Sequence, residues 1–242
     1  NKGIKMSNKP FAVGLRVMHD QELINKNQYG DYSSFLDPAS YKLTHVTSDN
    51  HGVYSFCMCP GGYVVNSSSE DGRLVVNGMS NYKRDSGVAN SAIVVSVSEK
   101  DYGSKLFDGL RFQQSLEEKA YKIGNGSIPI QRYIDFKDNV YKGNYKVNDS
   151  VIKGSYSYAN LRGIFPDFIS RNFISGMEYF NKKIPGFSND DELLLGVESR
   201  TSSSIKMNRD EEYQSNISGI YPAGEGAGYS GGITTSAMDG IL

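Results

Sequence analysis

The chain has 242 residues, of which 22% are charged, and a formal net charge of −1. This near-neutral balance, without a basic stripe, argues against a nucleic-acid partner, and no apolar run reaches the roughly 20 residues of a membrane-spanning helix. The two cysteines are too few for a disulfide scaffold, so we expect a reducing, cytoplasmic setting.

Alternating apolar and polar residues predict closely spaced strands in the first hundred residues. Short turns such as residues 67–72 separate these strands, which favours antiparallel pairing in a meander. One short helix is expected at residues 21–28. The expected strands cover residues 9–18, 41–47, 52–58, 63–66, 73–79 and 91–98.

Two helical patterns stand out in the second half of the chain. Apolar residues at helical spacing predict a helix over 108–123, and a second helical region over 158–180 begins or breaks at Pro166. Between them we expect a strand at 128–136 and a polar, tyrosine-dotted loop or mobile flap at 137–158. Further strands are expected at residues 193–197, 204–207 and 217–222.

The glycine-rich segment near the C-terminus carries the clearest chemical signal. It reads Gly224-Glu225, then a turn with several glycines, and then a small-residue stretch that can begin a helix at Ile233. Glycine lets a backbone approach a ligand closely, a helix N-terminus offers unpaired N–H groups, and the Glu225 carboxylate suits a ligand hydroxyl. The alternative is an ordinary strand-to-helix connection. The candidate cofactor-binding residues are Gly224, Glu225, Gly226, Gly228, Gly231, Gly232 and Ile233.

This segment resembles the C-terminal flavin motif of FAD-dependent oxidoreductases. Five further segments resemble one family, the predicted FAD-dependent dehydrogenases of bacteria, whose own chemistry is little characterised. The resemblance implies FAD as the cofactor more firmly than it implies a reaction. The segments are Phe56–Gly62, Leu74–Ser80, Arg84–Asp85, Ala89–Ala92 and Gly196–Ser203.

The same resemblance implies a GxGxxG turn near the N-terminus of the whole protein, which would hold the FAD pyrophosphate. No such turn follows a strand here, and Gly224–Tyr229 mimics its spacing without the βαβ context. We therefore expect an α+β piece of a longer α/β FAD-binding flavoprotein. Residues 9–185 would form an antiparallel-sheet substrate or cap domain, and residues 186–242 the C-terminal part of the FAD-binding domain.

The pair Cys57 and Cys59 is the most reactive candidate outside the glycine-rich segment. In a regular strand both side chains share one face, which admits a redox dithiol, although a bridge between such close residues is strained. A zinc site would need further ligands, and the three histidines are scattered, so no metal is expected. The alternative is a strand end near the flavin or in the core, with Pro60, Gly61 and Gly62 turning the chain close to the ring.

Two polar segments are candidates for the flavin or substrate vicinity. The guanidinium of Arg200, beside Thr201 and Ser202, suits a carboxylate or phosphate, but the segment can also be a solvated turn. Arg84 and Asn90 can form a polar clamp, or Arg84 can be part of a surface pair of little energetic value. Cys57, Cys59 and Arg200 are weak candidates for catalysis, and the sequence identifies no general base.

The first functional hypothesis is that the chain forms part of an FAD-dependent oxidoreductase. Such an enzyme would move a hydride or electron pair to or from a small organic substrate. The sequence leaves open whether NAD(P)H is the electron source. The alternatives are a flavin-scaffold binding or accessory module without redox turnover, and a flavin-linked dithiol reductase that uses Cys57 and Cys59. Without the pyrophosphate turn, we expect residues 1–242 alone to bind FAD weakly or not at all and to be inactive. The sequence leaves the substrate and the oligomeric state open.

Overall fold

The computed structural model describes residues 3–242, and its contacts divide the chain into two compact units. Unit 1 contains the residues up to Ala12 together with Ser96–Ser115 and Arg200–Leu242. Unit 2 contains Val13–Val95 and Leu116–Ser199. None of the helices among residues 3–242 combines the length and apolar character that a bilayer span requires.

Unit 2 is organised by a mixed sheet of seven strands in the order β10-β8-β11-β2-β7-β4-β3. Strand β11 pairs antiparallel with β2 and β8, and β4 pairs antiparallel with β3 and β7. Strand β10 runs parallel to β8. The neighbouring strands β2 and β7, in the middle of the sheet, are almost continuously buried, because both faces of the sheet are covered. The strands are β2 (Phe11–Asp20), β3 (Thr44–Val46), β4 (Gly52–Cys59), β7 (Val88–Val97), β8 (Ile128–Arg132), β10 (Tyr156–Tyr158) and β11 (Leu193–Glu198).

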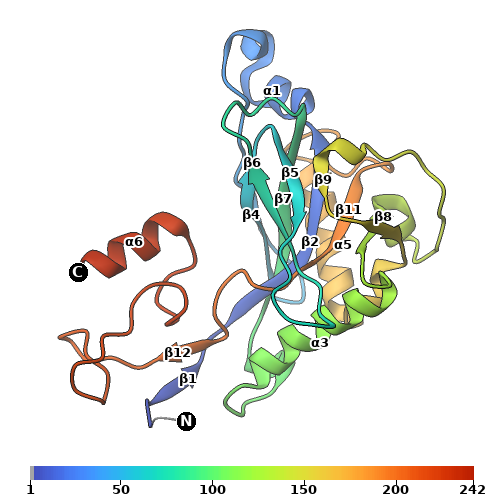
Figure 1. The fold of residues 1–242 in the computed structure, drawn as a ribbon. Coiled ribbons are helices and arrows are strands. Elements are labelled where there is room, and N and C mark those ends of the chain that lie inside the picture. Colours follow the sequence, from blue (N-terminus) through green and yellow to red (C-terminus); the bar gives the residue numbers. More distant parts are fainter. Residues whose placement is uncertain (1–2) are drawn as a thin grey trace. The chain divides into compact units, whose positions relative to one another are not determined.

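Two layers cover this sheet. A smaller sheet of three strands, in the order β6-β5-β9, contacts β4 and β11, and α5 (Asp167–Asn181) contacts β3 and β4. In Figure 1 the small sheet lies in front of the large one and α5 lies behind it. The small sheet contains β5 (Gly62–Asn66), β6 (Val76–Ser80) and β9 (Ile152–Lys153).

The remaining helices follow local signals in the sequence. Asp20 caps α1 (Gln21–Tyr29) by accepting a hydrogen bond from the Glu22 N–H at 2.9 Å. Pro166 directly precedes α5, where its missing N–H costs no helical hydrogen bond. The other helical elements are η1 (Gly30–Phe35), α2 (Glu99–Tyr102), α3 (Asp108–Ile123), α4 (Tyr133–Lys137), η2 (Asp149–Val151) and η3 (Leu161–Ile164).

Unit 1 gathers three separate stretches of chain. Strands β1 (Met6–Asn8) and β12 (Ile205–Met207) pair antiparallel, and α6 (Ile233–Ile241) follows the glycine-rich segment. The Thr201 hydroxyl donates to the Ala12 carbonyl at 2.8 Å and accepts from the Ala12 N–H at 3.2 Å. Phe11 stacks on Tyr102 with ring centroids 5.1 Å apart.

Most expected elements are confirmed. The α+β class with antiparallel-rich sheets holds, and α3 has the expected bounds. The mobile-flap segment 137–158 is mainly irregular but includes η2, β9 and β10. The strands expected at 9–18, 52–58, 63–66, 73–79, 91–98, 193–197 and 204–207 and the helices expected at 21–28 and after Gly232 are present, with shifts of a few residues at their ends.

Four expectations are wrong. Residues 217–222 form a turn around Gly219 (φ +81°) rather than a strand, because the Ser215 N–H bonds to the Ile220 carbonyl and closes the chain on itself. The strand expected at 128–136 ends at Arg132, where α4 begins, and that expected at 41–47 is reduced to β3. The simple meander fails because β5 and β6 leave the large sheet and pair with each other.

The expected boundary between residues 185 and 186 differs from the division seen in the contacts. Strand β11 follows that boundary in sequence, yet it pairs with both β2 and β8 inside unit 2. Residues 200–242, in contrast, belong to unit 1. The chain therefore passes from unit 2 to unit 1 directly after β11.

A buried arginine joins the two sheets of unit 2. Arg16, on β2, is 0% exposed and forms an ion pair with Glu198 of β11 (Nε to Oε2, 2.8 Å). Its Nη1 donates to the Cys57 carbonyl at 2.8 Å and to Asn90 Oδ1 at 3.1 Å, and its Nη2 donates to Asn77 of β6 at 2.9 Å. The guanidinium thus satisfies polar groups from four strands at once.

Burial raises the pKa of Glu198, although the Arg16 guanidinium acts in the opposite direction by stabilising the carboxylate. The space around the guanidinium is also filled. A Cβ on Gly78 would lie 2.3 Å from Arg16 Nη1, so only glycine fits at this position of β6. The ion pair and its neighbours therefore form one closely packed polar core.

Arg16→Ala should lower the free energy of unfolding by about 3–5 kcal/mol, because it leaves the Glu198 carboxylate buried without a partner. Urea unfolding followed by circular dichroism measures this loss. The control is Lys26→Ala, which removes the exposed Glu22–Lys26 pair and should change stability by at most about 0.5 kcal/mol. Equal small losses in both variants would contradict a central role for Arg16.

Candidate functional site

A cavity of about 260 Å³ in unit 1 brings together two segments that the sequence marks as candidate sites. Arg200 and Ser202 line it from the stretch after β11, and Glu225 and Gly226 line it from the glycine-rich turn. We call it the glycine-turn cavity. Its other lining residues are Leu110, Gln113, Ser203, Ser204 and Ile205.

The polar groups of the glycine-turn cavity include one that lacks a protein partner. Ser204 is only 4% exposed, and its hydroxyl makes no hydrogen bond with any atom of residues 3–242. A buried hydroxyl without a partner costs about 1–3 kcal/mol, so a ligand atom that bonds to it would remove this penalty. Glu225 adds a carboxylate, which acts against the lowering of the Lys9 pKa by burial.

The glycines of the turn are required for different reasons. Gly228 has φ +89°, and a Cβ there would lie 2.4 Å from the Ile205 carbonyl oxygen, so the protein itself requires this glycine. Gly224 also has a positive φ of +72°. A Cβ on Gly226 would meet no heavy atom within 4 Å, and its φ is not in the left-handed region. Packing within residues 3–242 therefore does not explain why position 226 is a glycine. The close approach of a ligand to the backbone would explain it.

Asp239 of α6 joins this helix to Arg209 through an ion pair and to the glycine-rich turn through a backbone hydrogen bond. Arg209 bonds to both carboxylate oxygens of Asp239 on α6, at 2.6 and 3.0 Å, and Asp239 Oδ2 also accepts from the Gly224 N–H at 2.7 Å. The guanidinium lies 3.6 Å from the centroid of the Tyr229 ring. Sequence reasoning did not identify Arg209 or Asp239, because neither belongs to a spacing that indicates contact.

The other predicted residues of unit 1 lie outside this lining. The Thr201 side chain is engaged with the Ala12 backbone. Gly232 is the N-cap of α6 in extended conformation, without a side-chain capping bond, and Ile233 begins the helix. Gly231 has only Ser202 near its Cβ position, at 4.0 Å.

In unit 2 the strand with the two cysteines is irregular. Cys57 has φ +44° and is exposed, at a point where the register between β4 and β7 shifts. The expected shared face therefore does not follow, since regular alternation stops there. Both cysteines are thiols, and burial raises the pKa of Cys59 although Arg16, 3.9 Å from its Sγ, acts in the opposite direction.

The turn after Cys59 is tight for reasons internal to the protein. A Cβ on Gly61 would lie 1.7 Å from the Arg84 carbonyl oxygen, and one on Gly62 would lie 2.2 Å from the Met79 carbonyl oxygen. The Pro60 carbonyl accepts from Ser80 at 2.8 Å.

The two residues expected to form a polar clamp have different surroundings. Arg84 is exposed, with φ +53°, whereas Asn90 is fully buried in the Arg16 network. Asn90 therefore has a structural partner already.

A family model described as "FAD-dependent protein, C-terminal domain-like" matches residues 10–201. The chain belongs to this family. It is also 45% identical over 248 residues to an uncharacterized protein of Clostridium beijerinckii, an alignment that covers 99% of the chain and 46% of the relative. The chain thus spans about half the length of the relative it matches.

The glycine-turn cavity fits part of the flavin cofactor that the family description implies. Ser204 supplies a buried hydroxyl in need of a partner, Glu225 an acceptor for ligand hydroxyls, and Gly226 an open approach. FAD is far larger than this cavity, so these residues can hold only a portion of it. No three or more His, Cys, Asp and Glu side chains among residues 3–242 are placed to bind a metal ion.

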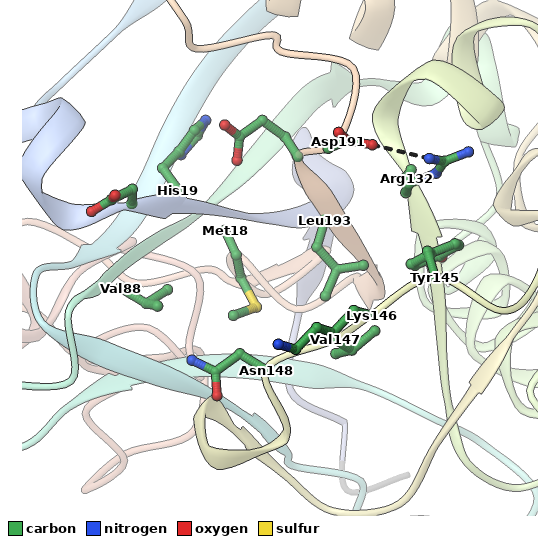
Figure 2. Close-up of a pocket in the computed structure, with 12 residues that line it drawn as sticks. Met18, His19, Val88, Arg132, Tyr145, Lys146, Val147, Asn148, Asp191 and Leu193 are labelled. Atoms are coloured by element: carbon green, nitrogen blue, oxygen red, sulfur yellow. Dashed lines mark hydrogen bonds and ion pairs between the residues drawn. The ribbon is translucent and has the colours of Figure 1, made fainter.

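A second cavity of the chain, about 430 Å³ in volume, lies in unit 2 where β2, β8 and β11 meet (Figure 2). We call it the Lys146 cavity. Sequence reasoning missed it, because it combines short pieces of segments far apart in the chain. Its lining residues are Met18, His19, Asp20, Val88, Arg132, Tyr145, Lys146, Val147, Asn148, Asp191, Glu192 and Leu193.

Two titratable groups at the edge of this cavity are neutral near pH 7. Burial, helped by the charges of Asp20 and Asp191, raises the pKa of Glu192 to about 8. Burial lowers the pKa of His19 to about 4. His19 Nε2 lies 2.8 Å from the Phe187 carbonyl, which can only accept, so Nε2 carries the proton of the neutral ring.

Glu192→Gln should make the protein more stable than the unmodified chain at pH 8 but not at pH 5. The folded Glu192 retains a proton that the unfolded chain releases above about pH 4.5. Wild-type stability therefore falls as the pH rises from about 4.5 to 8, by on the order of 1 kcal/mol per pH unit at most. Urea unfolding between pH 5 and 8.5 measures the difference. The exposed control Glu211→Gln should retain the wild-type slope, and a pH-independent difference for Glu192→Gln would contradict the raised pKa.

Proposed function

We propose that the chain forms part of an FAD-dependent oxidoreductase that transfers a hydride or electron pair to or from a small organic substrate. The family description supports the cofactor. When bound, the flavin would supply the redox chemistry, while the protein binds it, orients it and excludes water. The substrate-binding and redox steps would belong to the longer protein.

The observation that carries this proposal is the meeting of Arg200, Ser202, Glu225 and Gly226 around the unpartnered Ser204 hydroxyl. In the proposed role, Glu225 accepts hydrogen bonds from cofactor hydroxyls, and Ser204 donates to a cofactor oxygen. Arg200 lines the cavity, and a guanidinium there would stabilise an anion. The N-terminus of α6, a helix that Asp239 anchors near its other end, adds N–H groups and partial positive charge to the same segment.

The structure gives less support to a dithiol reductase. An attacking cysteine works as the thiolate, and the raised pKa of Cys59 favours the protonated form at neutral pH. We therefore propose that electrons pass at the flavin and not through Cys57 and Cys59. A purely structural role for the flavin stays the second candidate, since the fold alone does not determine the reaction.

Gly226→Val should weaken FAD binding by the full-length protein about tenfold or more, because Gly226 lines the cavity, a Cβ there meets no protein atom within 4 Å, and the added side chain would take up space meant for the cofactor. The visible absorption band of the purified protein, before and after reconstitution with FAD, measures flavin content. Gly240→Ala on α6 is the control, since a Cβ there also meets no atom within 4 Å but does not line the cavity. Undiminished flavin in Gly226→Val would remove the cavity from the cofactor site, and a wild-type protein without flavin after reconstitution would overturn the FAD proposal.

The double variant Cys57→Ser/Cys59→Ser should retain both its flavin and the wild-type rate of flavin reduction by NADH or NADPH. The reason is that the proposed electron transfer needs no thiolate. Stopped-flow absorbance at the flavin band measures the rate. Loss of turnover with the flavin still bound would favour the dithiol reductase instead.

A further inference from the structure

The Lys146 cavity opens on one face of the large sheet. Leu193 of β11 pairs with Met18 of β2 and with Arg132 of β8, and residues paired in antiparallel strands share a face. Arg16, two residues before Met18, points to this same face and bonds to Asn77 of the small sheet. The cavity therefore lies on the side of the large sheet that carries the small sheet.

Apolar side chains form much of the wall. Met18 and Leu193 contribute from the strands, Val88 from the start of β7, and Val147 from the loop that leads into η2. Figure 2 shows Met18 and Leu193 on the side of Lys146 and Asn148, with His19 pointing the other way. A volume of about 430 Å³ falls within the range of small-molecule sites, about 300–1,000 Å³. An apolar wall of this kind suits the hydrocarbon body of a ligand.

Most charged groups at the cavity already have protein partners. Arg132 bonds to Asp191 at 3.0 Å and, through Nε, to Asp135 at 3.0 Å. Asp20 caps α1 by accepting from the Glu22 N–H. The Arg132 guanidinium is therefore matched by two carboxylates, whereas the Asp20 carboxylate is bonded to the backbone and adds a negative charge at the rim.

Glu192 and His19 contribute no charge to this face near pH 7. His19 alternates with Met18 along β2, so its side chain points to the opposite face, as Figure 2 shows. The Tyr133 N–H bonds to the Glu192 carbonyl and continues the β8–β11 register, so Glu192 alternates with Leu193 in the same way. Both groups are also neutral there, for the reasons given above.

Lys146 is then the cation of this lining that remains for a ligand. It forms no ion pair with any of residues 3–242 and lines the cavity from the loop. Beside it, Asn148 uses its Oδ1 to accept from the Ser150 N–H and hydroxyl. The amide N–H groups of Asn148 are thus left as donors next to the Lys146 ammonium.

We propose that the Lys146 cavity binds a small organic carboxylate with an apolar body. The carboxylate would accept hydrogen bonds from Lys146 Nζ and Asn148 Nδ2, and the hydrocarbon part would lie against Met18, Val88 and Leu193. This site is carried by unit 2 alone and does not depend on the flavin proposal.

Isothermal titration calorimetry of the purified full-length protein with hexanoate, hexanol and hexylamine tests the site. Hexanoate should bind saturably and more tightly than either of the other two. Lys146→Gln should weaken hexanoate binding about tenfold, as expected for loss of a charge-assisted hydrogen bond. Lys142→Gln, in the same loop but not in the lining, should leave it unchanged.

A second variant places a negative charge directly in the cavity. Val147→Asp should abolish hexanoate binding, and an unchanged circular dichroism spectrum would show that the fold is retained. Tighter binding of hexylamine than of hexanoate would mean that the carboxylates of the rim dominate, and would overturn the proposal. So would equal hexanoate binding by Lys146→Gln and the wild type, or no saturable binding of hexanoate at all.

Discussion

The buried Arg16–Glu198 ion pair is the constraint around which unit 2 is arranged. A guanidinium with no access to water needs protein acceptors for its donors, and here the acceptors come from β4, β6, β7 and β11. Each of these strands must therefore occupy a fixed position relative to β2. The interaction specifies how the small sheet sits on the large one, which apolar packing alone would leave less defined.

This arrangement also decides which polar groups of unit 2 are available to a ligand. Asn90 and the Cys57 carbonyl are taken up by Arg16, and the glycines after Cys59 accommodate neighbouring backbone. Three residues differ from these. Within residues 3–242, the Ser204 hydroxyl of unit 1 has no hydrogen-bond partner, the space beside Gly226 is open, and Lys146 of unit 2 forms no ion pair. These unmatched groups, each in the lining of a cavity, are what make the two cavities candidate ligand sites.

Local patterns in the sequence were sufficient for much of the fold. The helix at 108–123 follows from apolar spacing, and the start of α5 follows from Pro166. Alternation does not say which strand is the partner, so the departure of β5 and β6 from the large sheet could not be foreseen. Ile217 and Ile220 resemble a strand in sequence, but Gly219 turns the chain between them. The glycine-rich turn was identifiable, whereas the Lys146 cavity depends on tertiary register.

The discontinuous make-up of unit 1 has a consequence for the order of assembly. Met6 of β1 pairs with Met207 of β12, so this contact closes a loop that contains the whole of unit 2. The entropy of closing such a loop is smaller once the intervening chain is compact. During synthesis from the N-terminus, β1 must wait until β12 has left the ribosome. The β1–β12 pairing can therefore form only after the chain of unit 2 has been synthesised.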